Sequence, residues 1–185
     1  VITYMRPFKI GDRVEIGETI GDVTERSLLV TRVRTIKNLD VTVPNSTILG
    51  NHIINFTKNA KEDIGIVLHT SVTIGYDVAS GDVIKALVKG AKETKLILEK
   101  PEPFVLVKSL DDFYINYEIN CHTKYPEKSG IIYSSLHENI KNELHNAGIE
   151  ILSPHYNAVR DGNGLTVPSE NIPKDYSKPG FKIDK

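Results

Sequence analysis

The chain has 185 residues, a length that fits one large domain or two small ones. Hydrophobic residues make up 39% of the sequence and charged residues 25%, which is far from the composition of disordered chains. The 23 Lys and Arg side chains nearly balance 24 Asp and Glu, and the net charge is −1. This balance excludes a general electrostatic attraction to nucleic acid or to an anionic membrane surface.

The charge is distributed unevenly, which indicates two units. Residues 1–61 carry nine basic and six acidic side chains, whereas the remainder carries fourteen and eighteen. Cys121 is the sole cysteine, so an intrachain disulfide is impossible. No run approaches the roughly 20 apolar residues of a membrane-spanning helix, so we expect this piece to be soluble. Because the chain begins with Val1 rather than methionine, we expect residues upstream to have been removed.

Residues 6–56 consist of short β-type runs broken by glycine. The runs are 13–16, 22–24, 28–36 and 41–43. Pro44 ends the fourth run, since proline cannot donate a hydrogen bond to a sheet ladder. Several strands of this length separated by turn signals are typical of a small antiparallel barrel. We predict an SH3-like or Sm-like barrel over about residues 7–50.

Residues 64–153 follow the order strand, helix, two strands, helix, strand. Apolar residues alternate along 64–76, which predicts a strand with one buried face. Ser80 is the predicted N-cap of an amphipathic helix that reaches Lys92. Its apolar stripe is formed by Val83, Ile84, Leu87, Val88 and Ala91. Further segments are predicted as strands at 104–107 and 113–122, a helix at 129–147 closed by Gly148, and a strand at 149–152.

This βαββαβ order is that of a ferredoxin-like α/β domain. The predicted fold class is therefore α+β, with an Sm-like small β-barrel followed by a ferredoxin-like domain. The boundaries are 7–56 for the β domain, 57–63 for a polar linker, 64–153 for the α/β domain and 154–185 for the tail. We expect the tail to be extended or disordered, because it is rich in proline and glycine.

Neither a catalytic nor a metal-binding pattern is present. The six histidines lack the spacing that places two imidazoles on adjacent turns of a helix. Cys121 and His122 are neighbours on a predicted strand, where their side chains point to opposite faces and cannot form a thiolate–imidazole pair. We interpret Cys121 as a core residue. The sequence predicts no enzyme activity, catalytic residue, cofactor or metal site.

A set of short motifs in the first 56 residues carries a resemblance to a known family. The motif residues are Arg6, Pro7, Phe8, Gly11, Asp12, Gly21, Arg34, Pro44, Asn45, Asn51, Asn55 and Phe56. Their order and spacing resemble the small-conductance mechanosensitive channel (MscS) family. The second unit also resembles this family, from Ile74–Asp77 through Ala147–Ile151, so the resemblance covers about residues 4–153.

The resemblance implies a part of an ion channel that opens under membrane tension during osmotic stress. Members assemble from identical subunits into rings, typically heptamers, whose β and α/β domains form a hollow vestibule with side portals. Residues 1–6 would be the end of a missing pore helix, and missing N-terminal helices would hold the full-length protein in the cell membrane, with this fragment at the cytoplasmic face. The vestibule would act as scaffold and prefilter for ions and small osmolytes, with portal edges around residues 55–63. The tail departs from the family pattern.

Two other functions remain open. A free-standing Sm-like nucleic-acid-binding module with a ferredoxin-like regulatory domain would use basic residues of the first unit. Its aromatic residues are limited to Tyr4, Phe8 and Phe56, which supply a poor stacking platform, and we therefore expect no nucleic acid as partner. A small phosphatase or ligand sensor would need an arginine near a glycine-rich turn, but the sole arginine of the second unit is Arg160. Apolar spans encoded upstream of Val1 would favour the channel.

Overall fold

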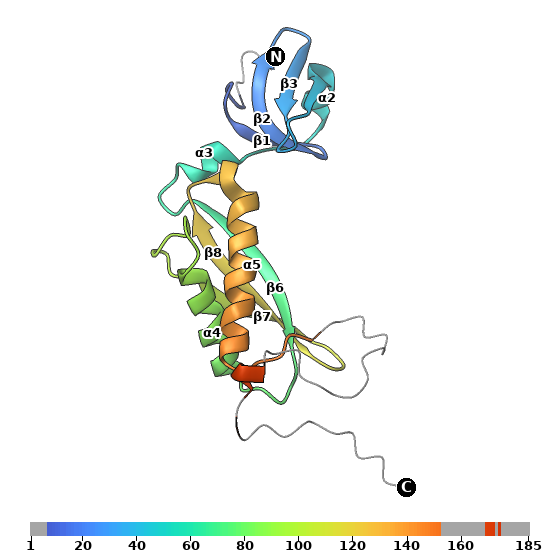
Figure 1. Cartoon of the computed structure of the whole chain (residues 1–185). Coiled ribbons are helices and arrows are strands. Elements are labelled where there is room, and N and C mark those ends of the chain that lie inside the picture. Colours follow the sequence, from blue (N-terminus) through green and yellow to red (C-terminus); the bar gives the residue numbers. More distant parts are fainter. Residues whose placement is uncertain (1–6, 153–168, 173, 175–185) are drawn as a thin grey trace. The chain divides into compact units, whose positions relative to one another are not determined.

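The computed structural model describes residues 7–152, 169–172 and 174, and it shows a mixed α+β fold with antiparallel pairing in both sheets (Figure 1). The chain divides into two compact units, each built from two stretches of sequence. One comprises Val1–Val67 with His122–Ile131, and the other Leu68–Cys121 with Ile132–Lys185. Within the described ranges, no helix has the length and apolar character that a membrane span requires.

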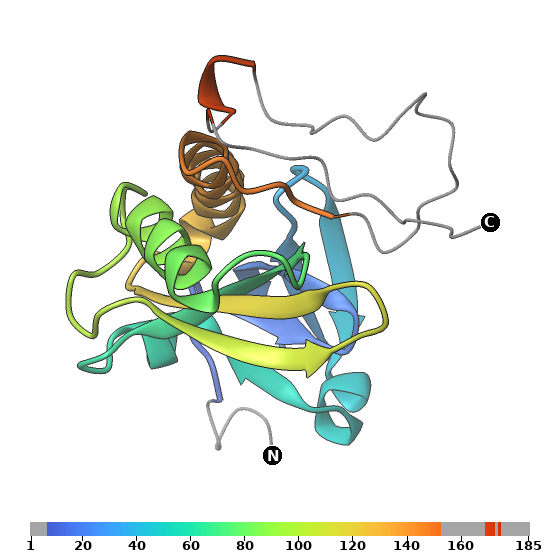
Figure 2. The same ribbon diagram turned by 90° about the horizontal axis from the view of Figure 1, so that it is seen from below.

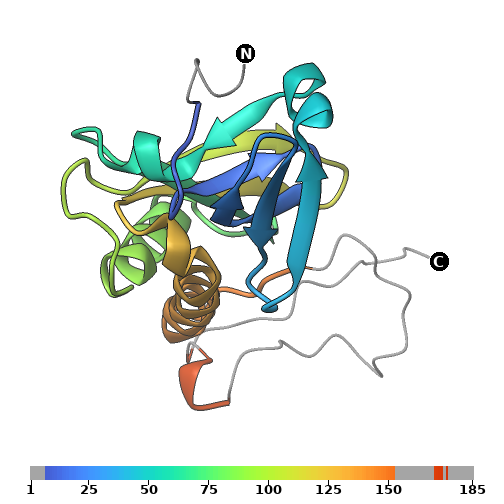
Figure 3. The same cartoon turned by 90° about the horizontal axis from the view of Figure 1, so that it is seen from above.

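The first unit contains a five-stranded sheet of order β4-β3-β2-β1-β5. Its strands are β1 (Arg13–Ile16), β2 (Thr19–Arg26), β3 (Val30–Arg34), β4 (Asp40–Pro44) and β5 (Ile53–Asn55), drawn in blue and cyan in Figures 1 and 3. All four pairings are antiparallel. Pro44 is the last residue of β4, as predicted.

Two short helices in this unit were not predicted. Helix α2 (Asn45–Gly50) follows β4 directly, and α3 (Phe56–Ala60) follows β5. Helix α3 occupies residues 57–60 of the segment 57–63, for which we predicted a polar linker and no helix. The side chain of Asn55 provides the reason, because it accepts a hydrogen bond from the backbone N–H of Lys58 and caps the helix.

The core of the first unit follows from the two-residue period of its strands. Alternate strand residues point inward, and Phe8 and Ile48 complete the cluster from outside the sheet. The buried strand residues are Val14, Ile16, Val23, Val33 and Val43. Gly21 is required by a close approach, since a Cβ atom there would lie 2.3 Å from the carbonyl oxygen of Arg34 on the neighbouring strand.

The second sheet has the order β6-β8-β7. The elements are β6 (Ile66–Ile74), α4 (Ser80–Lys92), β7 (Phe104–Leu110), β8 (Ile115–Thr123), the 3₁₀ helix η1 (Pro126–Lys128), α5 (Ser129–Asn146) and the 3₁₀ helix η2 (Ser169–Asn171). Both α-helices lie on one face of the sheet (Figures 1 and 2). The buried stripe of α5 is Ile132, Leu136, Ile140 and Leu144, as its spacing predicts.

The predicted last strand, 149–152, is wrong except for a single bridge between Ile151 and Ile74. The reason is the end of α5. Gly148 has a left-handed φ of +70°, and the N–H of Ile149 donates to the carbonyl of Leu144 at 2.8 Å. Ile149 is therefore bound in a Schellman motif and cannot join a ladder.

The start and the stripe of α4 also differ from the prediction. Ser80 is the first helical residue rather than the N-cap, which is Ala79, and the Ser80 hydroxyl lies 2.8 Å from the hydroxyl of Tyr117. Ile84 and Val88 are half-buried, whereas the other three predicted stripe residues are fully buried. Ala86 and Gly90 are buried as well, so the face of α4 that packs into the core is shifted toward these small residues relative to the predicted stripe.

Candidate functional site

The structure brings several of the predicted motif residues together where the chain enters β1. The side-chain amide of Asn55 donates to the carboxylate of Asp12 at 2.9 Å and to the backbone carbonyl of Pro7 at 3.2 Å. The same Asp12 oxygen accepts a hydrogen bond from the N–H of Lys9 at 2.9 Å. One carboxylate and one amide thus fix the entry segment to the end of β5.

The turn into β1 depends on neighbouring motif residues. Gly11 has a φ of +91°, which favours glycine, and its N–H donates to the carbonyl of Val23 at 2.8 Å. The N–H of Val23 donates in return to the carbonyl of Asp12 at 2.9 Å. The Phe8 side chain is buried, and the guanidinium of Arg26 lies 5.5 Å from the centre of its ring. These contacts show that the motif residues form the turn that leads the chain into β1.

Arg13, which the sequence indicated only as one of the basic residues that a nucleic-acid-binding module could use, makes several hydrogen bonds in this region. Its guanidinium forms two bonds of 2.8 Å to the carboxylate of Asp22. A third nitrogen donates to the carbonyl of Glu127 at 3.0 Å, and the backbone N–H of Arg13 donates to the hydroxyl of Thr57 at 2.8 Å.

Asn45 forms a separate hydrogen-bonded site. Its side-chain amide donates to the carbonyls of Ser27 and Leu28 at 3.0 and 2.9 Å. Its side-chain oxygen accepts from the hydroxyl of Thr31 at 2.9 Å. Asn45 therefore fixes the turn between β2 and β3, and the side chains of Leu28 and Leu29 at this turn are 82% and 75% exposed.

The remaining motif residues lie apart from these two sites. Arg34 forms an exposed ion pair with Asp40, whose hydrogen bond lowers the pKa of Asp40 and raises the pKa of Arg34. Asn51 donates to the carbonyl of Thr47 at 2.7 Å, and Phe56 is half-buried at the start of α3. Arg6 lies outside the described residues. The motif residues near the start of β1 thus form one turn, and the other motif residues make separate local contacts.

A second polar cluster occupies the face of the second sheet opposite the helices. The carboxylate of Glu118 lies 2.9 Å from the ammonium of Lys108 and 3.3 Å from a ring nitrogen of His69. Its hydrogen bond with Lys108 lowers the pKa of Glu118. Glu118 is only 8% exposed, so this pairing satisfies a charge that would otherwise be costly to bury. The arrangement is that of a structural ion cluster.

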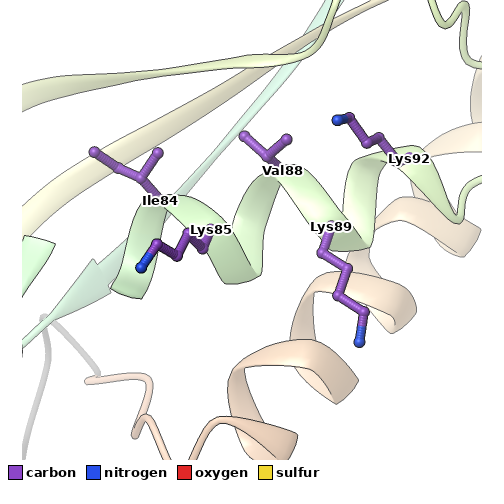
Figure 4. A pocket seen from close by; sticks show the side chains of 5 residues that line it. All are labelled: Ile84, Lys85, Val88, Lys89 and Lys92. Carbon is purple, nitrogen blue, oxygen red and sulfur yellow. The ribbon is translucent and has the colours of Figure 1, made fainter. Parts of the chain in front are cut away.

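A shallow, open groove of about 450 Å³ runs along the outer face of α4. It is lined by Ile84, Lys85, Val88, Lys89 and Lys92 (Figure 4). Each of its lysines pairs with a carboxylate: Lys85 with Asp82, Lys89 with Glu143 and Lys92 with Glu102. The hydrogen bond to Glu143 raises the pKa of Lys89. All three ammonium groups are thus paired with carboxylates of the protein.

Cys121 and the histidines are the residues considered above for thiol and metal chemistry. The described part of the chain contains no group of three or more His, Cys, Asp and Glu side chains that could hold a metal ion. Cys121 is fully buried, as interpreted from the sequence, and burial raises the pKa of its thiol to about 11. The thiol lies 3.5 Å from the carbonyl of Leu68. A neutral buried thiol of this kind is a core group.

Two family models match the chain in succession. The model described as the β-domain of mechanosensitive ion channels matches residues 1–58, and the model described as the C-terminal part of the mechanosensitive ion channel MscS matches residues 66–151. The chain belongs to the MscS family. An MscS family protein of Archaeoglobus fulgidus is 30% identical over 149 residues, which are 80% of this chain and 51% of the relative.

The chain is also similar to a named channel and to a solved structure of this family. The small-conductance mechanosensitive channel of Edwardsiella ictaluri is 33% identical over 89 residues, 46% of this chain and 31% of the channel. The crystal structure of Helicobacter pylori MscS in its closed state has a TM-score of 0.70 at 22% identity, covering 87% of this chain and 62% of that one. At this identity the likeness shows the fold alone. The chain spans about half the length of the Archaeoglobus fulgidus relative and of a second MscS family protein, from Buchnera aphidicola.

Proposed function

We propose that this chain is the cytoplasmic vestibule portion of a mechanosensitive ion channel that releases ions and small solutes under membrane tension. The observation that carries the proposal is the succession of the two family matches, 1–58 and 66–151, which together cover both sheets. In this function the vestibule is a scaffold and a solute prefilter. It needs no catalytic group and no cofactor, and its permeant species are ions and small osmolytes.

The ring would be built by the first sheet as an Sm-like barrel. The strand order leaves β4 and β5 as its two edges, and an exposed edge offers unpaired backbone groups to another chain. Ile54 on β5 is 43% exposed. We infer that β4 of one subunit pairs with β5 of the next around a closed ring, and the family suggests a heptamer.

The second sheet would form the ferredoxin-like wall of the vestibule. The chain order β6, α4, β7, β8, α5, followed by the Ile151 bridge to Ile74, supports this assignment. In terms of sequence we propose a β domain at 7–56, a connection at 57–63 and an α/β domain at 64–153, with 1–6 leading from a membrane helix and 154–185 as tail. Portal edges would lie around residues 55–63, where exposed Lys58, Lys61, Glu62 and Asp63 carry mixed charge.

The nucleic-acid alternative is weakened by contacts in the first sheet. Three of its four arginines, Arg13, Arg32 and Arg34, each pair with a carboxylate on a neighbouring strand. The ring of Phe8 is 1% exposed and cannot stack on a base. A single-strand binder needs exposed aromatic rings along a basic groove, so these observations favour the channel.

The test is electrophysiology on the full-length gene product. We expect purified full-length protein in liposome patches to conduct when suction raises membrane tension, and to be closed without it. Light scattering in detergent should give a particle of several identical subunits. A monomeric particle, or patches that stay silent up to the tension at which the membrane ruptures, would refute the proposed function.

A further inference from the structure

Arg13 occupies an unusual position for an arginine of a small β-sheet. It lies at the start of β1 and is only 8% exposed. In the antiparallel register it is directly opposite Asp22 on β2. A buried guanidinium must have its donors satisfied, because leaving them unpaired costs more than a hydrogen bond is worth. The partners of its nitrogens therefore show what the residue does.

The guanidinium connects two segments far apart in the sequence. Nε and Nη2 donate to the two carboxylate oxygens of Asp22, both at 2.8 Å. This fork fixes the plane of the group and directs Nη1 toward η1, where it donates to the carbonyls of Glu127 at 3.0 Å and Pro126 at 3.4 Å. The planar, multidentate geometry of arginine permits both contacts at once, whereas the single ammonium of lysine does not.

The same end of β1 also holds the chain segment that follows the first sheet. The backbone N–H of Arg13 donates to the hydroxyl of Thr57 in α3. Farther along, the segments approach closely again, since a Cβ atom at Gly65 would lie 2.4 Å from the carbonyl oxygen of Thr123. The segments 56–65 and 122–131 both belong to the first unit. They are thus tied to β1 and to each other.

Segment 126–128 in turn leads into a long helix. The carbonyl of Pro126, one acceptor of Arg13, also accepts the hydroxyl of Ser129 at 2.7 Å, and Ser129 is the first residue of α5. The carbonyl oxygen of Pro126 thus accepts hydrogen bonds both from the guanidinium of Arg13 in β1 and from the first residue of α5. Movement of η1 away from β1 would break the Arg13 contacts and leave the guanidinium partly unsatisfied.

We propose that Arg13 is a positioning residue for permeation, which holds η1 and α3 at a fixed separation beside β1. This inference rests on the proposed function, in which side portals have edges around residues 55–63. The guanidinium of Arg13 fixes η1, while α3 is bound by the backbone N–H of the same residue. Through its side chain, Arg13 therefore limits how far η1 can move and the width to which such an opening can relax. Loss of the contact to η1 widens the range of openings and eases the passage of large ions.

The experiment compares two arginine-to-lysine variants of the full-length channel. Arg13→Lys keeps the charge near Asp22 but cannot also reach the η1 carbonyls. The matched control is Arg34→Lys, because Arg34 forms the same fork with Asp40, at 2.8 and 3.1 Å, on the same sheet. That pair is half exposed. Both variants are checked for assembly by light scattering.

Two measurements decide the outcome. In single open channels, we expect Arg13→Lys to shift the conductance ratio of gluconate to chloride upward, while Arg34→Lys leaves it at the wild-type value. Reduced folding alone would lower the number of channels and leave the ratio unchanged. By hydrogen exchange, the backbone amides of residues 126–130 should exchange about tenfold faster in Arg13→Lys, given the strength of hydrogen bonds to charged groups.

The inference and the proposed function fail in different ways. If the wild type conducts under tension but Arg13→Lys has the wild-type ratio and the wild-type exchange rates, the inference is overturned alone. A wild type that never conducts refutes the proposed function and the permeation role with it. If Arg13→Lys does not assemble, the isosteric Asp22→Asn is used instead. It removes one of the two carboxylate oxygens that accept from Nε and Nη2 and that direct Nη1 toward η1. An unchanged ratio in that variant also overturns the inference.

Discussion

Replacing Asn55 with alanine should destabilise the first unit, because one side chain serves three partners. Its amide nitrogen donates to Asp12 and to the carbonyl of Pro7. Its oxygen caps α3 by accepting from the N–H of Lys58 at 2.9 Å. Alanine removes all three contacts and leaves the Asp12 carboxylate with fewer donors.

The magnitude follows from the kinds of bond that are lost. Loss of an N-cap side chain costs about 1 kcal/mol. A hydrogen bond to a charged group contributes about 1.5–3 kcal/mol and a neutral one about 0.5–1.5 kcal/mol. The three contacts share one amide group and are partly solvated, so the losses do not add fully. We expect Asn55→Ala to lower the free energy of unfolding by about 2–3 kcal/mol.

The assay is urea denaturation of the 185-residue chain, followed by far-ultraviolet circular dichroism and by the fluorescence of its eight tyrosines. Asn51→Ala is the matched control, since Asn51 is exposed and makes one local bond to Thr47. Its effect should stay within about 0.5 kcal/mol. Equal effects of the two substitutions would refute the reasoning, because they would show that the Asp12–Asn55 contact contributes nothing beyond an exposed bond.

An isosteric variant separates the cap from the carboxylate contact. Asn55→Asp keeps an acceptor for the N–H of Lys58 but places a second carboxylate near Asp12, where the amide donor now lies at 2.9 Å. Two carboxylates this close share a proton in the folded state, so their folded pKa is raised. Stability relative to wild type should therefore be recovered at low pH and lost as the pH rises above about 5. A pH-independent difference would contradict this assignment.

Three further substitutions, and one control, test two close approaches and one buried charge. Gly65→Ala should cost about 1–3 kcal/mol in urea denaturation, because φ is +69° and the new Cβ would lie 2.4 Å from the carbonyl of Thr123; no loss would contradict the close approach. Gly90→Val should lower the melting temperature, since the Cβ would meet the α5 backbone at 3.0 Å, whereas Gly81→Ala in the same helix meets open space and should not. Glu118→Gln should flatten the acid limb of the stability curve: the folded pKa of Glu118 is lowered from 4.5, so its contribution is present above that value and disappears as the pH falls through the folded pKa. An equally steep acid limb in the variant would show that Glu118 does not contribute.

Sequence patterns predicted the elements that have a strong period and missed those that depend on a single contact. The spacing of four in α5 placed that helix and its buried stripe, because every residue repeats the same signal. The alternation in β8 placed the strand and its apolar buried face, but it did not indicate that Glu118, Asn120 and His122 on the other face are buried too. Helix α3 has five residues and no apolar stripe, and it forms where Asn55 supplies a cap. The last strand was overpredicted because the apolar run Ile149–Leu152 carries no sign that Ile149 is engaged by the end of α5.

For the candidate site, the sequence identified several of the residues but not the contacts between them. Asp12 and Asn55 were identified through the family motif, but nothing in the sequence indicates that they are bonded to each other across 43 positions. Arg13 carried no signal of its contact to η1, because its acceptor at Glu127 is a backbone carbonyl 114 residues away. Backbone acceptors have no residue-type signature, so a side chain that binds them cannot be found by pattern.

Two arginine–carboxylate forks of the first sheet show why burial decides the role of such a pair. Arg13–Asp22 and Arg34–Asp40 are both cross-strand pairs with similar bond lengths. The side chain of Arg13 is 9% exposed and that of Arg34 is 49% exposed. Water can replace the partner of Arg34 when the pair separates, and such pairs contribute little to stability. The Asp22 side chain is 42% exposed, but the guanidinium of Arg13 is not, and it also donates to the carbonyl of Glu127. The Arg13 pair therefore holds η1 beside β1, whereas the Arg34 pair joins only neighbouring strands of one sheet.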